Sequence, residues 1–186
     1  MGTRFGLSGL IRLAFLAALG IIVLTGCATM AKYQEQAKPY QGLADQATGR
    51  FGVGTVTVTV SQMAGFGGRY DRLARTITLV PNSDPAMRLV LAHELGHHIL
   101  GHTDMLLAQE MAANAMAVKV LQVWGMTEEQ AYRGWANRLL WSKQQGYTPN
   151  KGHDFCAEFA DLRDHYPNYL ARDPAKVTAT CPGAGS

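Results

Sequence analysis

The sequence predicts a small α+β fold, in which a short antiparallel sheet or hairpin packs on a helical core. Residues 55–60 and 75–80 each alternate between polar and apolar side chains, as half-buried strands do. From residue 84 onward the chain carries longer runs that begin and end with helix signals. Its 186 residues are 47% hydrophobic and 17% charged, a composition that suits one globular domain with appendages.

The two alternating stretches are the predicted strands. The valines of residues 55–60 share one face, and Ile77 and Leu79 share one face of residues 75–80. Residues 62–68 hold three glycines, which predict a mobile loop. Residues 28–50 are polar and rich in small side chains, so we expect a spacer there, with room for a short helix.

The first predicted helix begins at Asp84 and ends near Leu100. Asp84 can cap free N–H groups at the helix start, and Pro85 fits the first helical position. Gly101 favours the left-handed conformation that commonly follows the last turn.

Three further helices are predicted. Residues 105–124 are apolar nearly all round, and their many alanines and two charges indicate a buried core helix rather than a membrane span. Thr127 and Gln130 form a capping box that starts the next helix, which ends near Gly146. Residues 153–165 form the last helix, with its large apolar side chains facing inward.

The predicted helix from Asp84 to Leu100 contains the motif H-E-x-x-H at His93, Glu94 and His97. The two histidines are four residues apart, so they project from one helix face and can both bind one metal ion. Zn²⁺ in a catalytic site takes three protein ligands and lowers the pKa of water in its fourth position to about 7. Glu94 is placed to take a proton from that water as a general base.

The third metal ligand is predicted to be Glu110, which lies early in the next helix. A turn between the helices would complete a His, His, Glu ligand set. Asn114 lies one turn further along the same face and could hold the free ring nitrogen of a ligand histidine. The metzincin arrangement would need a ligand at Thr103, and His102 misses that position by one residue. We expect His98 and His102 to be surface or packing residues.

Residues 1–26 form a predicted targeting segment. Arg4 and Arg12 precede an apolar stretch that is shorter than a typical membrane-spanning helix. The segment ends in Leu-Thr-Gly before Cys27, which resembles a bacterial lipobox and implies cleavage before Cys27 and its lipidation. An ordinary cleavage site or an uncleaved anchor is the alternative. Ala28 favours the periplasmic side of the outer membrane over the inner membrane.

Charge and cysteine content limit the partners and the compartment. The formal charge is +3, and two of these charges lie in the leader, which leaves about +1 for the rest of the chain. That is too little to predict a nucleic-acid partner. Cys156 and Cys181 can form one disulfide in an oxidising compartment, and two free buried thiols are the alternative.

Residues 69–118 resemble the compact gluzincin peptidases, especially the HtpX-type and ImmA/IrrE-type families. The resemblance rests on HELGH followed by LGH at residues 93–102 and on E-x-x-A-N at residues 110–114. It implies a zincin-like fold with zinc as cofactor, and these site residues: His93, His97 and Glu110 as zinc ligands, and Glu94 as general base. The chain departs from the families at position 114, where Asp is commoner, and in the short spacing between its last two ligands.

The resemblance also implies roles for two other segments. In gluzincins a strand just before the motif helix borders the cleft and pairs with extended substrate, a role that residues 75–80 would take. In HtpX-type enzymes a histidine after the ligand helices is thought to steady the tetrahedral intermediate. His153 could match that residue, Tyr147 or His165 could serve instead, and a merely solvent-exposed His153 is the alternative.

Together these observations predict a zinc-dependent endopeptidase that hydrolyses extended or misfolded cell-envelope proteins and is held at the membrane by its lipid. The predicted parts are a lipoprotein signal peptide at residues 1–26, a lipid-anchored spacer at 27–50 and a zinc metallopeptidase domain at 51–186. Two other functions stay open. One is a zinc-binding envelope assembly or chaperone-like factor with little or no hydrolysis, and the other is a zinc hydrolase that acts on cell-wall peptides.

Overall fold

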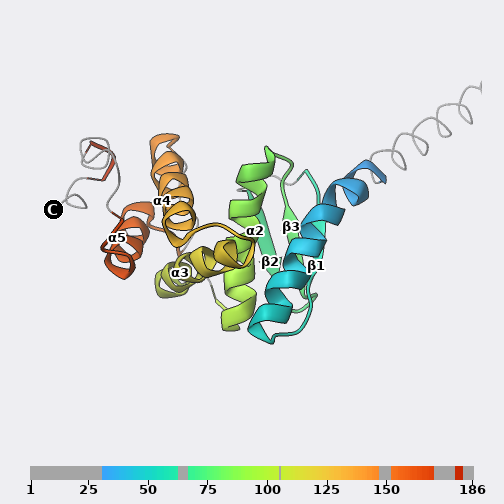
Figure 1. The fold of residues 1–186 in the computed structure, drawn as a ribbon. Helices are drawn as coiled ribbons and strands as arrows, with labels where there is room; N and C mark the ends of the chain where they lie inside the picture. The colour runs from blue at the N-terminus through green and yellow to red at the C-terminus, as the bar shows by residue number, and fades with distance from the viewer. Residues whose placement is uncertain (1–30, 63–66, 105, 147–151, 170–178, 182–186) are drawn as a thin grey trace, which may run out of the picture.

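The chain adopts the predicted α+β arrangement, with a small three-stranded sheet beside a group of helices (Figure 1). A helical segment at residues 31–51 precedes the sheet, and helices α2 to α5 follow it. The computed structural model describes residues 31–62, 67–104, 106–146, 152–169 and 179–181. The predicted signal segment and the predicted lipidation site at Cys27 lie outside the described residues.

The sheet contains β1 (Thr57–Val60), β2 (Gly68–Asp71) and β3 (Thr76–Leu79) in the order β1-β3-β2. β2 and β3 form an antiparallel hairpin, and β1 adds a strand parallel to β3. The expected valine face of β1 and the Ile77 and Leu79 face of β3 are buried. Alternation fixes which face of a strand is buried, but it carries no information on the direction of the neighbouring strand.

Residues 31–51 form a helix, where the sequence predicts a polar spacer up to residue 50. Its inward side is buried in the core and consists of Ala37, Tyr40, Ala44 and Ala47. The Tyr40 hydroxyl donates a hydrogen bond of 2.9 Å to Asp84 at the start of α2. The spacer prediction is wrong for this segment because its buried stripe is mostly alanine, which does little to raise its hydrophobicity. The folded domain therefore starts well before residue 51.

The same helix closes the outer edge of β1. Gln41 Oε1 accepts a hydrogen bond of 2.7 Å from the Val58 backbone N–H, and Gln41 Nε2 donates one of 2.9 Å to the Val56 carbonyl. The side-chain amide thereby takes the place of a neighbouring strand. At the other end of the sheet, β2 has no strand on its outer side within the described part of the chain.

Helix α2 (Asp84–Leu100) lies against β2 and β3 and matches the first predicted helix (Figure 1). Gly101 follows it in the left-handed conformation, with φ of 66°. Ser83 holds the N-cap position without a side-chain hydrogen bond, whereas Asp84, the predicted cap, accepts hydrogen bonds from Tyr40 and Arg88. A tertiary contact therefore fixes the start of α2 in place of the predicted cap.

Helices α3 (Leu107–Val123), α4 (Glu128–Gln144) and α5 (Phe155–His165) correspond to the other three predicted helices. α4 begins with the predicted capping box between Thr127 and Gln130. α3 packs against α2, α4 and α5, which explains its apolar composition. Across the described ranges, no helix is both long enough and apolar enough to cross a bilayer.

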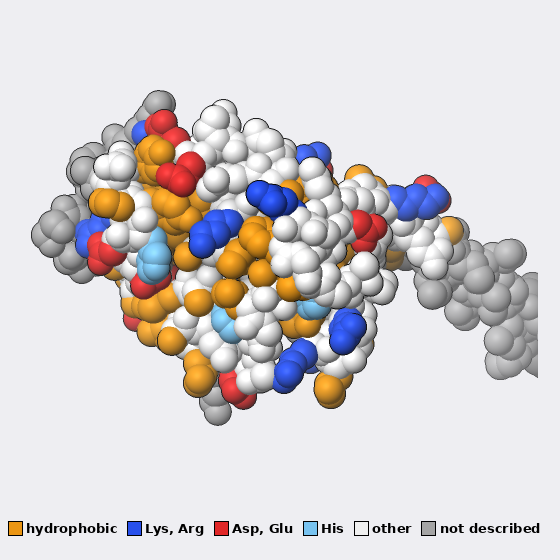
Figure 2. Space-filling model, turned by 60° about the horizontal axis from the view of Figure 1, so that its bottom comes forward, with side chains coloured by type: hydrophobic (Ala, Val, Ile, Leu, Met, Phe, Trp, Pro, Cys, Tyr) orange, Lys and Arg blue, Asp and Glu red, His pale blue; other side chains and the backbone are white. Residues whose placement is uncertain are grey.

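Cys156, in the first turn of α5, forms a disulfide with Cys181. The Cys181 side chain is fully buried, so the bond holds residues 179–181 against the helical part of the domain. The surface facing the viewer in Figure 2 carries hydrophobic side chains in its middle, with basic and acidic side chains scattered between them. Several histidine side chains also reach this surface.

Candidate metal centre

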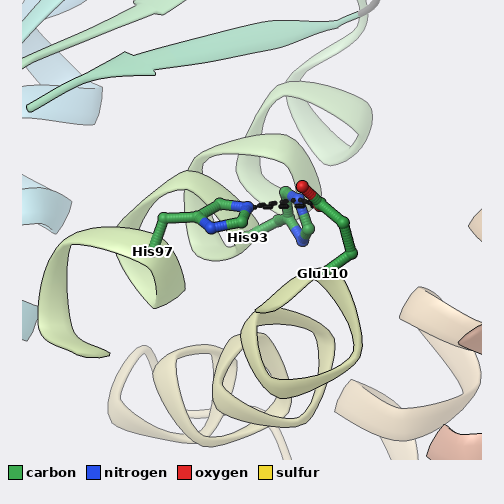
Figure 3. A group of neighbouring side chains, drawn as sticks. All are labelled: His93, His97 and Glu110. Carbon is green, nitrogen blue, oxygen red and sulfur yellow. Dashed lines mark hydrogen bonds and ion pairs between the residues drawn. The ribbon is translucent and has the colours of Figure 1, made fainter. Parts of the chain in front are cut away.

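His93 and His97 of α2 and Glu110 of α3 point toward one another between the two helices (Figure 3). The Nε2 atoms of the two histidines are 3.1 Å apart. Glu110 Oε2 lies 3.1 Å from His93 Nε2 and 3.3 Å from His97 Nε2. The fold thus brings together the three side chains that the sequence predicts as metal ligands.

A glycine inside the motif allows α3 to come this close to α2. A Cβ atom at Gly96 would lie 2.7 Å from the carbonyl oxygen of Ala113, so a side chain there would push the helices apart. Glu110 lies one turn before Ala113, and the close approach therefore carries its carboxylate to the histidines. Sequence reasoning missed this role, although the glycine within HELGH and the small residue within E-x-x-A-N were both visible.

The three side chains fit a divalent metal ion. Ligand atoms about 2.0–2.1 Å from a tetrahedral ion lie about 3.3 Å from one another, close to the separations in this cluster. Apart from its ion pairs with the histidines, the buried Glu110 Oε2 has no hydrogen-bond partner among the described residues. Two imidazoles and one carboxylate are suitable donors for zinc and for several other transition metals.

The charges within the cluster favour the ionised forms of Glu110 and His93. Burial alone would raise the pKa of the Glu110 carboxyl group, but contacts with His93 and His97 hold that pKa well below its usual range. Burial alone would lower the pKa of His93, but its contact with Glu110 and the negative charge of Glu94 raise it above its ordinary value. A bound cation would replace the proton on His93 in balancing the negative charge of the carboxylates.

His97 has a second contact that orients its ring. Its Nδ1 lies 3.0 Å from Nδ1 of His102, just beyond the end of α2, so its Nε2 is left to face Glu110. A hydrogen bond to the outer ring nitrogen fixes the tautomer of a ligand histidine. His102 is thus more than a packing residue, although it is not in the metal-binding cluster. Thr103, the metzincin position, bonds to Asp104 and also lies outside that cluster.

Asn114 does not hold a ligand histidine, contrary to the prediction. Its Nδ2 donates a hydrogen bond of 2.7 Å to Glu158 Oε2 of α5. Asn114 Oδ1 and His93 Nδ1 are both buried, and neither has a hydrogen-bond partner within the residues described. The prediction placed Asn114 on the same helix face as Glu110, but it could not locate Glu158, which is 44 residues away in sequence.

His153 lies at the edge of the cluster. Its Nε2 is 3.5 Å from Glu110 Oε2, and its Nδ1 is 3.0 Å from Glu158 Oε1. Burial would lower the pKa of His153, but the hydrogen bond to Glu158 and the charges of Glu158 and Glu110 raise it. Of the two alternatives to His153, His165 is exposed at the end of α5, and Tyr147 lies outside the described residues.

Trp135 of α4 packs directly on a predicted metal ligand. Its ring stacks on the His93 imidazole, with centroids 5.1 Å apart and an angle of 16° between the planes. The indole is buried, so it limits rotation of the His93 side chain. No local pattern in the sequence indicates that Trp135 would touch the site.

Glu94 faces β2 instead of α3. A Cβ atom at Gly68 of β2 would lie 3.4 Å from Glu94 Oε1 and 2.5 Å from Val90 Cγ1, so the glycine leaves space for the carboxylate. Residues 75–80, predicted to pair with substrate, contain the central strand β3, which has partners on both sides. That prediction is therefore wrong, and the strand beside Glu94 is β2.

Comparison with known families agrees with this geometry. Residues 48–132 match the family model of the IrrE N-terminal-like domain (Peptidase_M78). The matched segment includes the His, His, Glu cluster and Glu94, whereas His153 and Glu158 lie beyond it. No curated protein and no solved structure matches the chain. Over the matched segment, the chain is therefore similar to a metallopeptidase-like family.

Proposed function

We propose that the protein is a zinc-dependent endopeptidase that cleaves extended or misfolded segments of cell-envelope proteins. The observation that carries the proposal is the place of Glu94, which follows a metal ligand on α2 and lies beside the edge strand β2. The similarity to a metallopeptidase-like family supports the same class of reaction.

The residues of the site divide the chemical work. His93, His97 and Glu110 would hold zinc, which when bound polarises a carbonyl group and lowers the pKa of water. Glu94 would take a proton from the attacking water and pass it to the leaving amine. His153, with hydrogens on both ring nitrogens, would donate a hydrogen bond through Nε2 to the oxyanion that develops on the substrate, while its Nδ1–H faces Glu158.

The outer edge of β2, which has no strand partner among the described residues, supports an extended substrate. A peptide that pairs with an edge strand is held by main-chain hydrogen bonds, so its binding depends little on its sequence. Gly68 would let the peptide backbone come close to Glu94, because no side chain stands between them. Unfolded protein segments, unlike folded ones, can present such a free strand.

The proposed location is the cell envelope, with Cys27 as the lipidated first residue of the mature chain and the domain on the periplasmic side of the outer membrane. The disulfide between Cys156 and Cys181 supports an oxidising compartment. The order of residues before Cys27 supports a lipid anchor, which would tether the protein without spanning the bilayer.

The test measures zinc binding and cleavage in the same variants. The purified full-length chain is loaded with zinc against a competing chelator, and cleavage of casein, an unfolded protein, is followed. Glu110→Ala should bind zinc far more weakly because it removes one of three ligands. Glu94→Gln should keep its zinc and lose cleavage by about 10²–10⁴-fold. Glu35→Gln, at an exposed helical carboxylate, is the matched control and should change neither quantity.

Each contrary result has a distinct meaning. Equal zinc affinity in Glu110→Ala and wild type would show that the third ligand is misassigned. A zinc-loaded wild type that cleaves no unfolded protein would reject the peptidase proposal and favour an assembly or chaperone-like factor. Such a factor should also keep its biological activity in Glu94→Gln, since it needs zinc but no general base. Digestion of purified peptidoglycan would instead identify a cell-wall hydrolase.

A further inference from the structure

A buried chain of hydrogen bonds runs from α3 to His153 beside the metal centre. Asn114 Nδ2 donates to Glu158 Oε2 over 2.7 Å. Glu158 Oε1 accepts a bond of 3.0 Å from the Asp154 backbone N–H and lies 3.0 Å from His153 Nδ1. Asn114 is fully buried and Glu158 is 1% exposed, so water competes little for these bonds.

The Glu158 carboxylate requires a hydrogen on Nδ1 of His153 and leaves Nε2 as the ring nitrogen that can face the metal centre. A carboxylate accepts hydrogen bonds and cannot donate them, so His153 Nδ1 must be the donor. His153 Nε2 is then directed at Glu110 Oε2, 3.5 Å away. His153 is not among the residues whose ligand atoms lie close enough to share one ion, so it stands next to the metal centre as a neighbour.

The identity of residue 114 matches this arrangement. An aspartate there would put a second carboxylate against Glu158 in a buried place, where like charges repel strongly. Asparagine instead offers an N–H group to the Glu158 carboxylate. Asn114 replaces the Asp that is commoner in the families that the chain resembles, and it is chemically complementary to Glu158.

We propose that Glu158, held by Asn114, is a positioning residue that turns His153 Nε2 toward the reacting group at the metal centre. Its effect on turnover rests on the proposed peptidase function, whereas its effect on the His153 ring does not. A contact that merely joined α3 to α5 would alter stability without acting through His153.

A double-mutant cycle on casein cleavage by the zinc-loaded full-length chain tests the proposal. Glu158→Ala should lower kcat by about 10–100-fold with KM and zinc content little changed. In a His153→Gln background, the same Glu158→Ala change should cause no further loss, because both act through one ring. His165→Gln, at the exposed end of α5, is the control. An equal further loss in the His153→Gln background would overturn the proposal.

An exchange of the two polar groups tests the role of Asn114. Asn114→Asp should lower kcat by about 10–100-fold, because two carboxylates then face each other. Adding Glu158→Gln should recover about tenfold or more, since the new amide can donate to Asp at position 114 and still accept from His153. Failure of the double variant to recover, although it binds zinc normally, would contradict the complementarity of this pair.

The ring N–H of His153 gives a readout that needs no catalysis. In the zinc-loaded wild type, the His153 Nδ1 hydrogen should exchange slowly with solvent in NMR spectra, its signal assigned by its loss in His153→Gln. Exchange should become fast in Glu158→Ala and stay slow in His165→Gln. These results in a protein that cleaves no casein would uphold the positioning and reject the peptidase function. Fast exchange in the wild type would reject the positioning, whatever the activity.

Discussion

The two edge strands of the sheet differ in what lies beside them. The outer edge of β1 is closed by the side-chain amide of Gln41, which bonds to two backbone groups of that segment. β2 has no strand on its outer side among the described residues, and Gly68 at its start faces Glu94. The sheet edge away from the metal centre is therefore capped by Gln41, and the edge beside the metal centre has no strand partner among the described residues.

This difference shows where a free strand edge is useful. An uncovered edge can pair with strands of other chains and lead to aggregation, so proteins usually block it. Gln41 blocks β1 with a single side chain, and a similar residue could have blocked β2. The proposed function gives the open edge a use, because a peptide paired with β2 would lie next to Glu94.

Gly68→Ala should disturb the space between β2 and Glu94, and we expect it to have the largest effect of these variants. The new Cβ atom would lie 2.5 Å from Val90 Cγ1, so either the strand or the Val90 side chain must move, and the same Cβ atom would lie 3.3 Å from Cγ of Glu94, the general base. A displacement of about 1 Å can lower turnover by about 10²-fold. We therefore expect casein cleavage to fall by about 10–100-fold while zinc content stays at the wild-type level.

The double variant Gly68→Ala/Val90→Ala sharpens this test, because it removes the atom that the new methyl group would meet. It should recover part of the lost cleavage. Gly49→Ala is the control, since a Cβ atom there would meet nothing within 4 Å. Full activity in Gly68→Ala would mean that the space between β2 and α2 does not matter for catalysis.

Gln41→Ala should open the closed edge and affect stability instead of turnover. The change leaves the buried Val58 N–H without its partner, which costs about 1–3 kcal/mol of unfolding free energy. Chemical denaturation measures this loss, and zinc content and casein cleavage should stay unchanged. Gln46→Ala, on the same helix but exposed, should cost much less. A comparable loss of cleavage in Gln41→Ala would remove the distinction between the two edges.

Tyr40→Phe should have the smallest effect, because it removes one hydrogen bond between the helix at residues 31–51 and α2. We expect a loss of about 1 kcal/mol near neutral pH. Burial and the bond to Asp84 raise the pKa of Tyr40 to about 12, against about 10 in the unfolded chain. Folding thus favours the neutral phenol, and this contribution is full below about pH 10 and is lost as the pH rises toward about 12.

Denaturation of wild type and Tyr40→Phe at increasing pH checks the sign. The difference in unfolding free energy should be largest below about pH 10 and should shrink toward about pH 12. A difference that grows with pH would contradict the assignment, because it would mean that folding favours the ionised phenolate.

Local sequence was sufficient to predict helices α2 to α5 and the three residues of the candidate metal cluster. The i, i+4 spacing of His93 and His97 places both on one helix face whatever surrounds them. Glu110 was predictable because a short connection between two helices returns the chain to its neighbour. The capping box at Thr127 is likewise a property of four consecutive residues.

The features that local sequence could not predict depend on distant segments. Glu158 takes the amide of Asn114 from 44 residues away, and no spacing rule connects the two positions. The strand order was hidden because β2 is short and follows a glycine-rich stretch, so β3 was taken for an edge. The length of the helix at residues 31–51 and its packing against the core were not predicted, because alanines contribute little to a hydrophobic pattern but pack closely.

The disulfide between Cys156 and Cys181 closes a loop between positions 25 residues apart. On the chain-entropy account, such a closure stabilises the fold by about 3–4 kcal/mol, because it removes conformations from the unfolded chain. The bond begins in the same turn of α5 as Glu158, so it anchors the segment that carries the His153 partner. Part of the stability of this side of the site is therefore set by the redox state of the compartment in which the chain folds.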